Sequence, residues 1–106
     1  MSSEPGGEKP IYSDVARARL HAQTLGFRHR RYVHEGVLLQ VRVWPKRDQI
    51  YPVLVIEFSP RQGKVIDSFL VRSRTSGEEH PRRSGWLGAK MIMNGLRKER
   101  DEGRLD

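Results

Sequence analysis

The feature that most constrains the fold is a change in the spacing of the apolar residues. They follow a helical period near both ends of the chain and a strand-like pattern in between. Within the middle part, residues 51–58 are apolar on both alternating faces except for one glutamate. A run of this kind is typical of a strand covered on both sides. The pattern therefore predicts a sheet in the middle of the chain, with its central strand at 51–58 and a helix before and after it.

The first helical stripe predicts a helix over residues 13–25. Ser13 or Asp14 can cap its start by accepting a hydrogen bond from a free N–H group of the first turn. Gly26 stands where glycine commonly ends a helix in the left-handed conformation. The apolar positions recur at spacings of three and four, as one buried helix face requires. These positions are Val15, Ala18, Ala22 and Leu25.

Four strands are expected between the helices, over residues 27–33, 37–44, 51–58 and 64–74. The loops between them are short, and short loops join consecutive strands into an antiparallel meander. A second helical stripe begins at Trp86 and predicts a helix to about residue 97. Its apolar positions are Trp86, Ala89, Met93 and Leu96.

A chain of 106 residues has room for one domain. Two amphipathic helices need an apolar surface, and one face of the sheet is the only large one available. We therefore expect a two-layer α+β domain at residues 11–97: an N-terminal helix, an antiparallel sheet of three to four strands and a C-terminal helix, with both helices on one sheet face. Residues 1–10 are polar, and this composition predicts a disordered leader. Residues 98–106 are expected to form a charged tail that can fray.

Composition excludes several classes of protein. Without cysteine the chain has no disulfide scaffold, no thiolate zinc site and no cysteine nucleophile. No apolar run approaches the roughly 20 residues of a membrane span, and the polar N-terminus is not a signal peptide. Its four histidines do not form a ligand pattern, and no cofactor-binding or catalytic motif is present. We therefore expect a cytoplasmic, non-enzymatic protein with no cofactor, metal, membrane contact or catalytic residue.

The net charge of +7 points to an acidic partner. Of the 20 basic residues, 15 are arginine, whose planar fork of donors fits phosphates and guanine edges. An arginine-rich composition also follows from a GC-rich genome. The excess is local, because residues 28–74 hold ten basic and four acidic residues, and residues 82–100 hold six and one.

Arginine and aromatic residues alternate on the first two predicted strands. Arg28, Arg30 and Tyr32 share one face of the first, and Arg42 and Trp44 share one face of the second. A sheet face of this kind holds phosphates and stacks bases in several single-strand binders. An ordinary solvated sheet face is the alternative. The strands therefore favour a nucleic-acid-binding surface, mainly for phosphates, with Tyr32 and Trp44 as stacking groups.

The start of the second helix offers another anion site. Arg82, Arg83 and Lys90 lie near its free N–H groups, where a phosphate would be favoured. An ordinary polar loop is the alternative reading. Together, the expected nucleic-acid-binding residues are Arg28, Arg30, Arg31, Tyr32, Arg42, Trp44, Arg72, Arg74, Arg82, Arg83 and Lys90. The partner can be DNA or RNA.

Two other functions stay open. The first is a phage- or plasmid-type accessory protein, or a subunit of a larger assembly, that binds an acidic protein through Trp44 or a strand edge. Open strand edges also make a homodimer reasonable. The second is a small endoribonuclease with His29, His34 or His80 as acid or base. Glu57 and Asp67 are expected to pair with Arg42 or Arg72 across the sheet instead of acting in catalysis.

The helix–strands–helix order, with basic residues at the mouth of the last helix, resembles double-stranded-RNA-binding domains and the small toxins of toxin–antitoxin pairs that share that architecture. Gly26-Phe27 matches the Gly-Phe that opens the first strand of those toxins. Their Gly-Ser-His turn is replaced here by His34-Glu35-Gly36, and their run of lysines by Arg82-Arg83. A four-stranded sheet followed by a helix is also similar to single-strand-binding coactivator folds. These likenesses of topology carry no function, and we assign no family.

Overall fold

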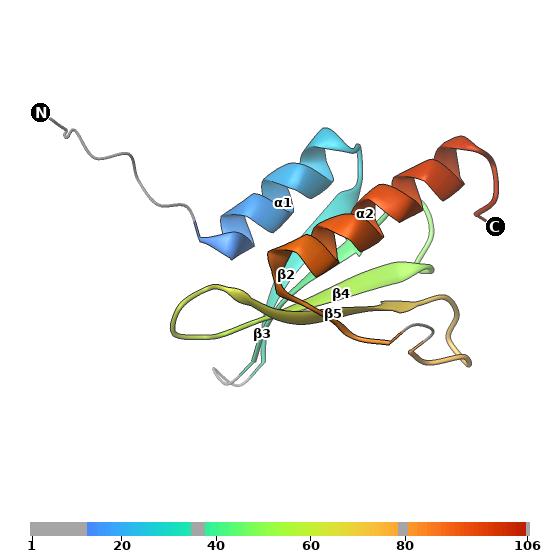
Figure 1. Ribbon diagram of the computed structural model, residues 1–106. Coiled ribbons are helices and arrows are strands. Elements are labelled where there is room, and N and C mark those ends of the chain that lie inside the picture. The colour runs from blue at the N-terminus through green and yellow to red at the C-terminus, as the bar shows by residue number, and fades with distance from the viewer. Residues whose placement is uncertain (1–12, 35–37, 79–80, 106) are drawn as a thin grey trace, which may run out of the picture.

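Two helices lie on one face of a five-stranded antiparallel sheet in the computed structural model, which describes residues 13–34, 38–78 and 81–105 (Figure 1). The strands lie side by side in the order β2-β3-β4-β5-β6. The expected α+β fold is therefore confirmed, with one strand more than expected. The elements are α1 (Asp14–Thr24), β2 (Arg28–His34), β3 (Leu38–Trp44), β4 (Val53–Phe58), β5 (Val65–Val71), β6 (Arg83–Ser84) and α2 (Gly85–Asp101).

Helix α1 begins and ends as the sequence predicts. The Ser13 side chain accepts a hydrogen bond from the backbone N–H of Ala16 at 3.3 Å, and Gly26 follows the helix with a φ of +75°. Asp14 fastens the helix to the sheet, because its Oδ2 accepts a hydrogen bond from the backbone N–H of Val65 at 2.9 Å. The buried residues of α1 are Val15, Ala18 and Ala22, which confirms the predicted stripe.

Helix α2 runs further than its apolar stripe predicts, to Asp101 instead of about residue 97. Of the predicted tail, residues 98–101 continue the helix, residues 101–104 are exposed, and Leu105 packs against the domain. Leu105 is 8% exposed and belongs to the hydrophobic core, and Lys46 Nζ donates a hydrogen bond to its backbone oxygen at 3.2 Å. The buried residues of α2 are Gly88, Ala89, Met93 and Leu96.

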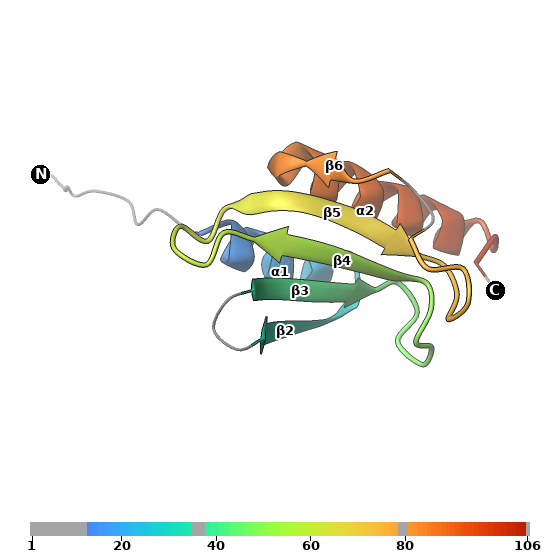
Figure 2. The same ribbon diagram turned by 90° about the horizontal axis from the view of Figure 1, so that it is seen from below.

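Strand β4 is the middle strand, and both its faces are covered. The helices cover the face that carries Leu54, Ile56 and Phe58, all fully buried. The face that points away from the helices, here called the open face, is turned toward the viewer in Figure 2. Val55 on the open face is still only 5% exposed, because its register partners Arg42 and Phe69 lie on either side of it. Side chains of neighbouring strands therefore take the place of a helix layer.

Strand β6 falls in a segment that the sequence predicts as a polar loop. It is only two residues long and pairs Arg83 with Ser68 and Ser84 with Asp67. Two residues cannot show a period, so no sequence pattern marks such a strand. Within the described part of the chain, neither helix is long and apolar enough to cross a membrane. The predicted leader and His80 lie outside the described residues.

Candidate functional site

Strand register brings five of the predicted binding residues together at one end of the open face. Arg28 lies opposite Trp44, Arg30 opposite Arg42, and Tyr32 opposite Gln40. Residues opposite each other in an antiparallel pair point to the same side. The predicted alternation is therefore confirmed, since all five side chains lie on the open face. They are Arg28, Arg30, Tyr32, Arg42 and Trp44.

The arginines of this group lie over the aromatic rings. The guanidinium carbon of Arg28 is 4.3 Å from the centre of the Trp44 ring. The corresponding distances to the Tyr32 ring are 4.8 Å for Arg42 and 5.7 Å for Arg30. These are cation–π contacts, and Trp44 beneath Arg28 is only 7% exposed. Trp44 is therefore not an open platform for a base in this arrangement; the outer layer consists of guanidinium groups.

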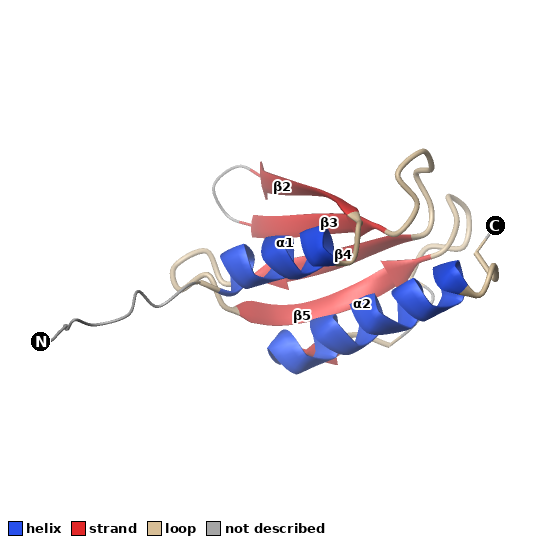
Figure 3. Ribbon diagram, turned by 90° about the horizontal axis from the view of Figure 1, so that it is seen from above, coloured by secondary structure: helices blue, strands red, loops and turns tan. Residues whose placement is uncertain are grey.

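More arginines gather on the other side of β2, which is an edge strand of the sheet (Figure 3). Arg31 and His29 point toward the helix side, and Arg19 of α1 donates from Nε to His29 Nδ1 at 3.5 Å. Burial and the positive charges of Arg19 and Arg47 lower the pKa of His29. The positive charges of Arg19 and Arg47 thus add to the effect of burial on His29.

We call this group of six arginines the basic edge. No member forms an ion pair with a carboxylate of the described residues. The sequence interpretation missed Arg19 and Arg47, because only the fold brings an α1 residue and a loop residue beside β2. The basic edge consists of Arg19, Arg28, Arg30, Arg31, Arg42 and Arg47.

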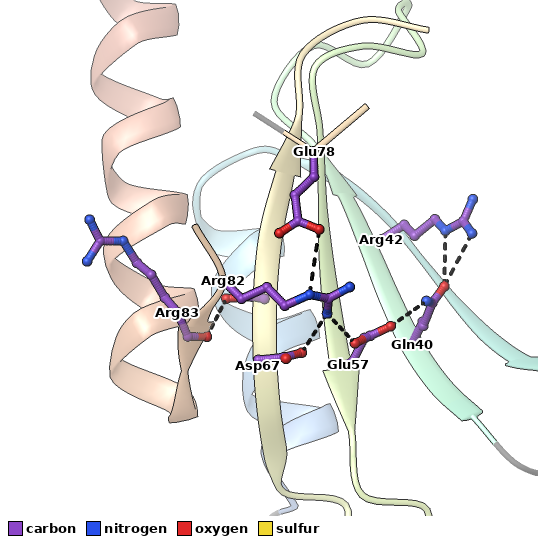
Figure 4. Close-up of polar contacts among 8 residues, drawn as sticks. Gln40, Arg42, Glu57, Asp67, Glu78, Arg82 and Arg83 are labelled. Atoms are coloured by element: carbon purple, nitrogen blue, oxygen red, sulfur yellow. Dashed lines mark hydrogen bonds and ion pairs between the residues drawn. The ribbon is translucent and has the colours of Figure 1, made fainter. Parts of the chain in front are cut away.

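Arg82 was expected at a phosphate site, but carboxylates surround it (Figure 4). Its Nη1 lies 2.7 Å from Glu57 Oε1 and 3.1 Å from Asp67 Oδ1, and its Nε lies 3.5 Å from Glu78 Oε2. The guanidinium group also stacks on Phe69. The expected pairing of Glu57 and Asp67 with Arg42 or Arg72 is therefore wrong, since Arg82 reaches over β5 and binds both.

This carboxylate cluster has unequal pKa values. Burial favours the neutral form of Glu57, but hydrogen bonds involving Asp67, Arg82 and Gln40 outweigh it and hold the pKa of Glu57 below its ordinary value. Burial and the hydrogen bond to Glu57 raise the pKa of Asp67. Three carboxylates lie around one guanidinium group, so the β4–β6 side of the open face does not share the positive charge of the β2–β3 side.

The structure does not assemble the site expected at the mouth of α2. Arg82 and Arg83 point to opposite sides of the sheet (Figure 4), and Arg83 lines a groove beside α2 with Leu70 and Met91. Lys90 lies one helical turn from Trp86, which faces α1. The side chain of Ser84 makes no capping hydrogen bond. The three cations therefore lie in three directions.

The remaining predicted residues also lie apart from the basic edge. Arg72 is held by Glu99 of α2 through two hydrogen bonds, of 3.0 and 3.1 Å. Arg74 is exposed in the loop after β5. In the described ranges, no group of three or more His, Asp or Glu side chains is placed to hold a metal ion. Comparison of the chain with known protein families, with characterised proteins and with solved structures found no match.

Proposed function

We propose that the protein binds nucleic acid through the basic edge, mainly by contacts to phosphates. The observation that carries this proposal is that six arginines, from α1, β2, β3 and the β3–β4 loop, lie around one strand without a carboxylate partner among the described residues. Clustering like charges at one edge raises the electrostatic energy of the free protein, and a polyanion relieves this by replacing its own counterions.

The stacked arginines are held in place before any phosphate binds. The rings beneath Arg28, Arg30 and Arg42 restrict their guanidinium groups, so less side-chain entropy is lost on binding. The carboxylate cluster around Arg82 would repel phosphates from the β4–β6 side. We therefore expect the nucleic acid to run along β2 and the β3–β4 loop and not across the whole open face.

The test compares two triple variants that remove the same charge. The first, Arg30→Ala with Arg31→Ala and Arg47→Ala, removes exposed members of the basic edge. The control, Arg61→Ala with Lys64→Ala and Arg97→Ala, removes exposed cations from the β4–β5 turn and α2.

Fluorescence anisotropy with labelled RNA and DNA oligonucleotides measures the dissociation constants. We expect the basic-edge variant to bind at least about tenfold more weakly than wild type and the control variant to stay within about threefold. Equal losses in both variants would mean that net charge alone drives binding. No binding by the wild type, together with a stoichiometric partner that survives nuclease treatment, would favour an acidic protein partner instead.

Binding without cleavage is part of the proposal. RNA incubated with the protein should stay intact on a denaturing gel. Cleavage that disappears in a His29→Ala variant would instead assign a ribonuclease activity to this region, because His29 lies beside Arg19 and Arg47 of the basic edge.

A further inference from the structure

A hollow beside β2 adjoins the stacked arginines. It has a volume of about 260 Å³ and is referred to here as the edge hollow. Ile50, at 69% exposure, contributes a large apolar side chain to its lining. Sites for drug-sized ligands usually measure about 300–1,000 Å³, so the edge hollow has room for one planar ring system. The residues that line it are Arg28, His29, Arg30, Tyr32, Trp44 and Ile50.

The edge hollow contains a flat, fixed stacking group. Arg28 lies over the Trp44 ring at 4.3 Å, and its Nη2 donates a hydrogen bond to the backbone oxygen of Gln49 at 2.9 Å. The ring and the carbonyl hold the guanidinium group from two directions. Unpaired bases stack on guanidinium planes as well as on aromatic rings, so a base above Arg28 would extend the stack that Trp44 begins.

Arg28 and Trp44 of the lining, and Gln49 next to Ile50, each carry a buried polar atom with no hydrogen-bond partner among the described residues. The three atoms are Arg28 Nε, Trp44 Nε1 and Gln49 Oε1. Native proteins pair nearly all such atoms, and an exception calls for an explanation. Two of the atoms are donors and one is an acceptor. A phosphate can use only the donors, whereas the edge of a nucleobase carries both donors and acceptors.

We infer that the edge hollow receives one unpaired nucleobase, so that the protein prefers nucleic acid with an unpaired base over a continuous duplex. The inference rests on the proposed function, since the basic edge would hold the phosphates on either side of that base. A base inside a duplex is paired and stacked and cannot enter such a hollow. Arg28 and Gln49 are only half-buried, so part of each side chain faces solvent, where a base can approach.

The test measures how much more tightly the protein binds a duplex with one unpaired nucleotide than a fully paired duplex, and this quotient of affinities is called the ratio below. One probe is a fully paired RNA duplex, and the second is the same duplex with a single unpaired nucleotide. A third probe carries an abasic site at that nucleotide. We expect wild type to bind the second probe at least about fivefold more tightly than the first, because stacking of one base contributes this much or more. The abasic probe should bind like the paired duplex.

Two variants assign the preference to the edge hollow. Ile50→Ala removes its exposed apolar wall, and Gln49→Met removes the unpaired acceptor while keeping the backbone oxygen that holds Arg28. Both should reduce the ratio to below about twofold and leave the affinity for the paired duplex unchanged. Ile66→Ala is the matched control, because Ile66 is an exposed isoleucine on β5, at 51% exposure, and it should keep the wild-type ratio.

The outcomes separate this inference from the proposed function. Equal binding of the three probes by wild type, or an unchanged ratio in both hollow variants, would overturn the unpaired-base inference while phosphate binding stands. Failure of wild type to bind any of the probes, or other RNA and DNA, would overturn the proposed function as well.

Discussion

Among the described glycines, Gly88 of α2 is the one at which an added Cβ would lie too close to a strand. A Cβ added there would lie 2.7 Å from the Cβ of Arg83, 3.1 Å from its carbonyl carbon and 3.3 Å from its carbonyl oxygen. Arg83 cannot shift easily. As part of β6 it pairs with Ser68 of β5, and its backbone oxygen accepts a hydrogen bond from the Ser68 hydroxyl. Alanine would therefore force α2 away from β6.

The expected cost of Gly88→Ala follows from two opposing effects. Alanine favours a helix over glycine by roughly 1 kcal/mol. Overpacking at a fixed backbone contact costs about 1–3 kcal/mol. The clash exceeds the helix preference for all but the smallest cost in this range, so we expect a net loss of about 1 kcal/mol. In a domain of this size such a loss lowers the melting temperature by about 4–8 °C.

Gly95→Ala is the matched control in the same helix. Gly95 is exposed, and in the described structure no non-local atom lies within 4 Å of an added Cβ. The full helix preference should then appear as a gain of roughly 0.5–1 kcal/mol. Urea unfolding followed by circular dichroism measures both free energies of unfolding. A gain in both variants would refute the close packing of α2 on β6.

Three titrating groups give further predictions. Because the pKa of Glu57 is lowered, the folded protein favours its charged form, and Glu57→Gln should lower the free energy of unfolding at pH 7 by about 1 kcal/mol. That contribution is complete above the ordinary value of 4.5 and is lost as the pH falls from there through the lowered pKa of the folded state. The pKa of Asp67 is raised, so Asp67→Asn should cost less than Glu57→Gln in the same urea titration, and a larger cost would contradict the assignment. His29 should titrate below 6.5 in the free protein by NMR, and a bound polyanion should raise its pKa, so that binding strengthens as the pH falls toward 6. A pKa that stays unchanged on binding would place the nucleic acid elsewhere.

The fold was largely predictable because its main elements carry long periodic patterns. The stripe of Val15, Ala18 and Ala22 fixed the buried side of α1, and the alternation of Val41 with Arg42 fixed the two faces of β3. The end of α2 was not predictable, because the residues after Leu96 are charged. Its last turn makes contacts with distant segments instead, such as those of Glu99 with Arg72 and of Arg100 with the backbone oxygen of Pro45.

The candidate site was predictable only in part. Arg28, Arg30 and Arg42 share a face because strand alternation puts them there. Arg82 was expected to be free, and its neutralisation depends on how a loop returns along β5 to carboxylates that lie 15 and 25 residues away in the sequence. Arg19 joins the site only because α1 packs beside β2. Counting charges along the chain shows neither which cations are neutralised by distant carboxylates nor which cations from different elements come together.

The salt dependence of binding tests the central claim most directly. If five or six phosphates meet the basic edge, the slope of log K against log salt should lie near −3.5 to −5 for wild type. The variant that lacks Arg30, Arg31 and Arg47 should lose about 2–3 units of this slope, because each lost phosphate contact removes about 0.7–0.9. The variant that lacks Arg61, Lys64 and Arg97 should keep the wild-type slope. A flat dependence for wild type, or the same slope in both variants, would contradict phosphate binding at the basic edge.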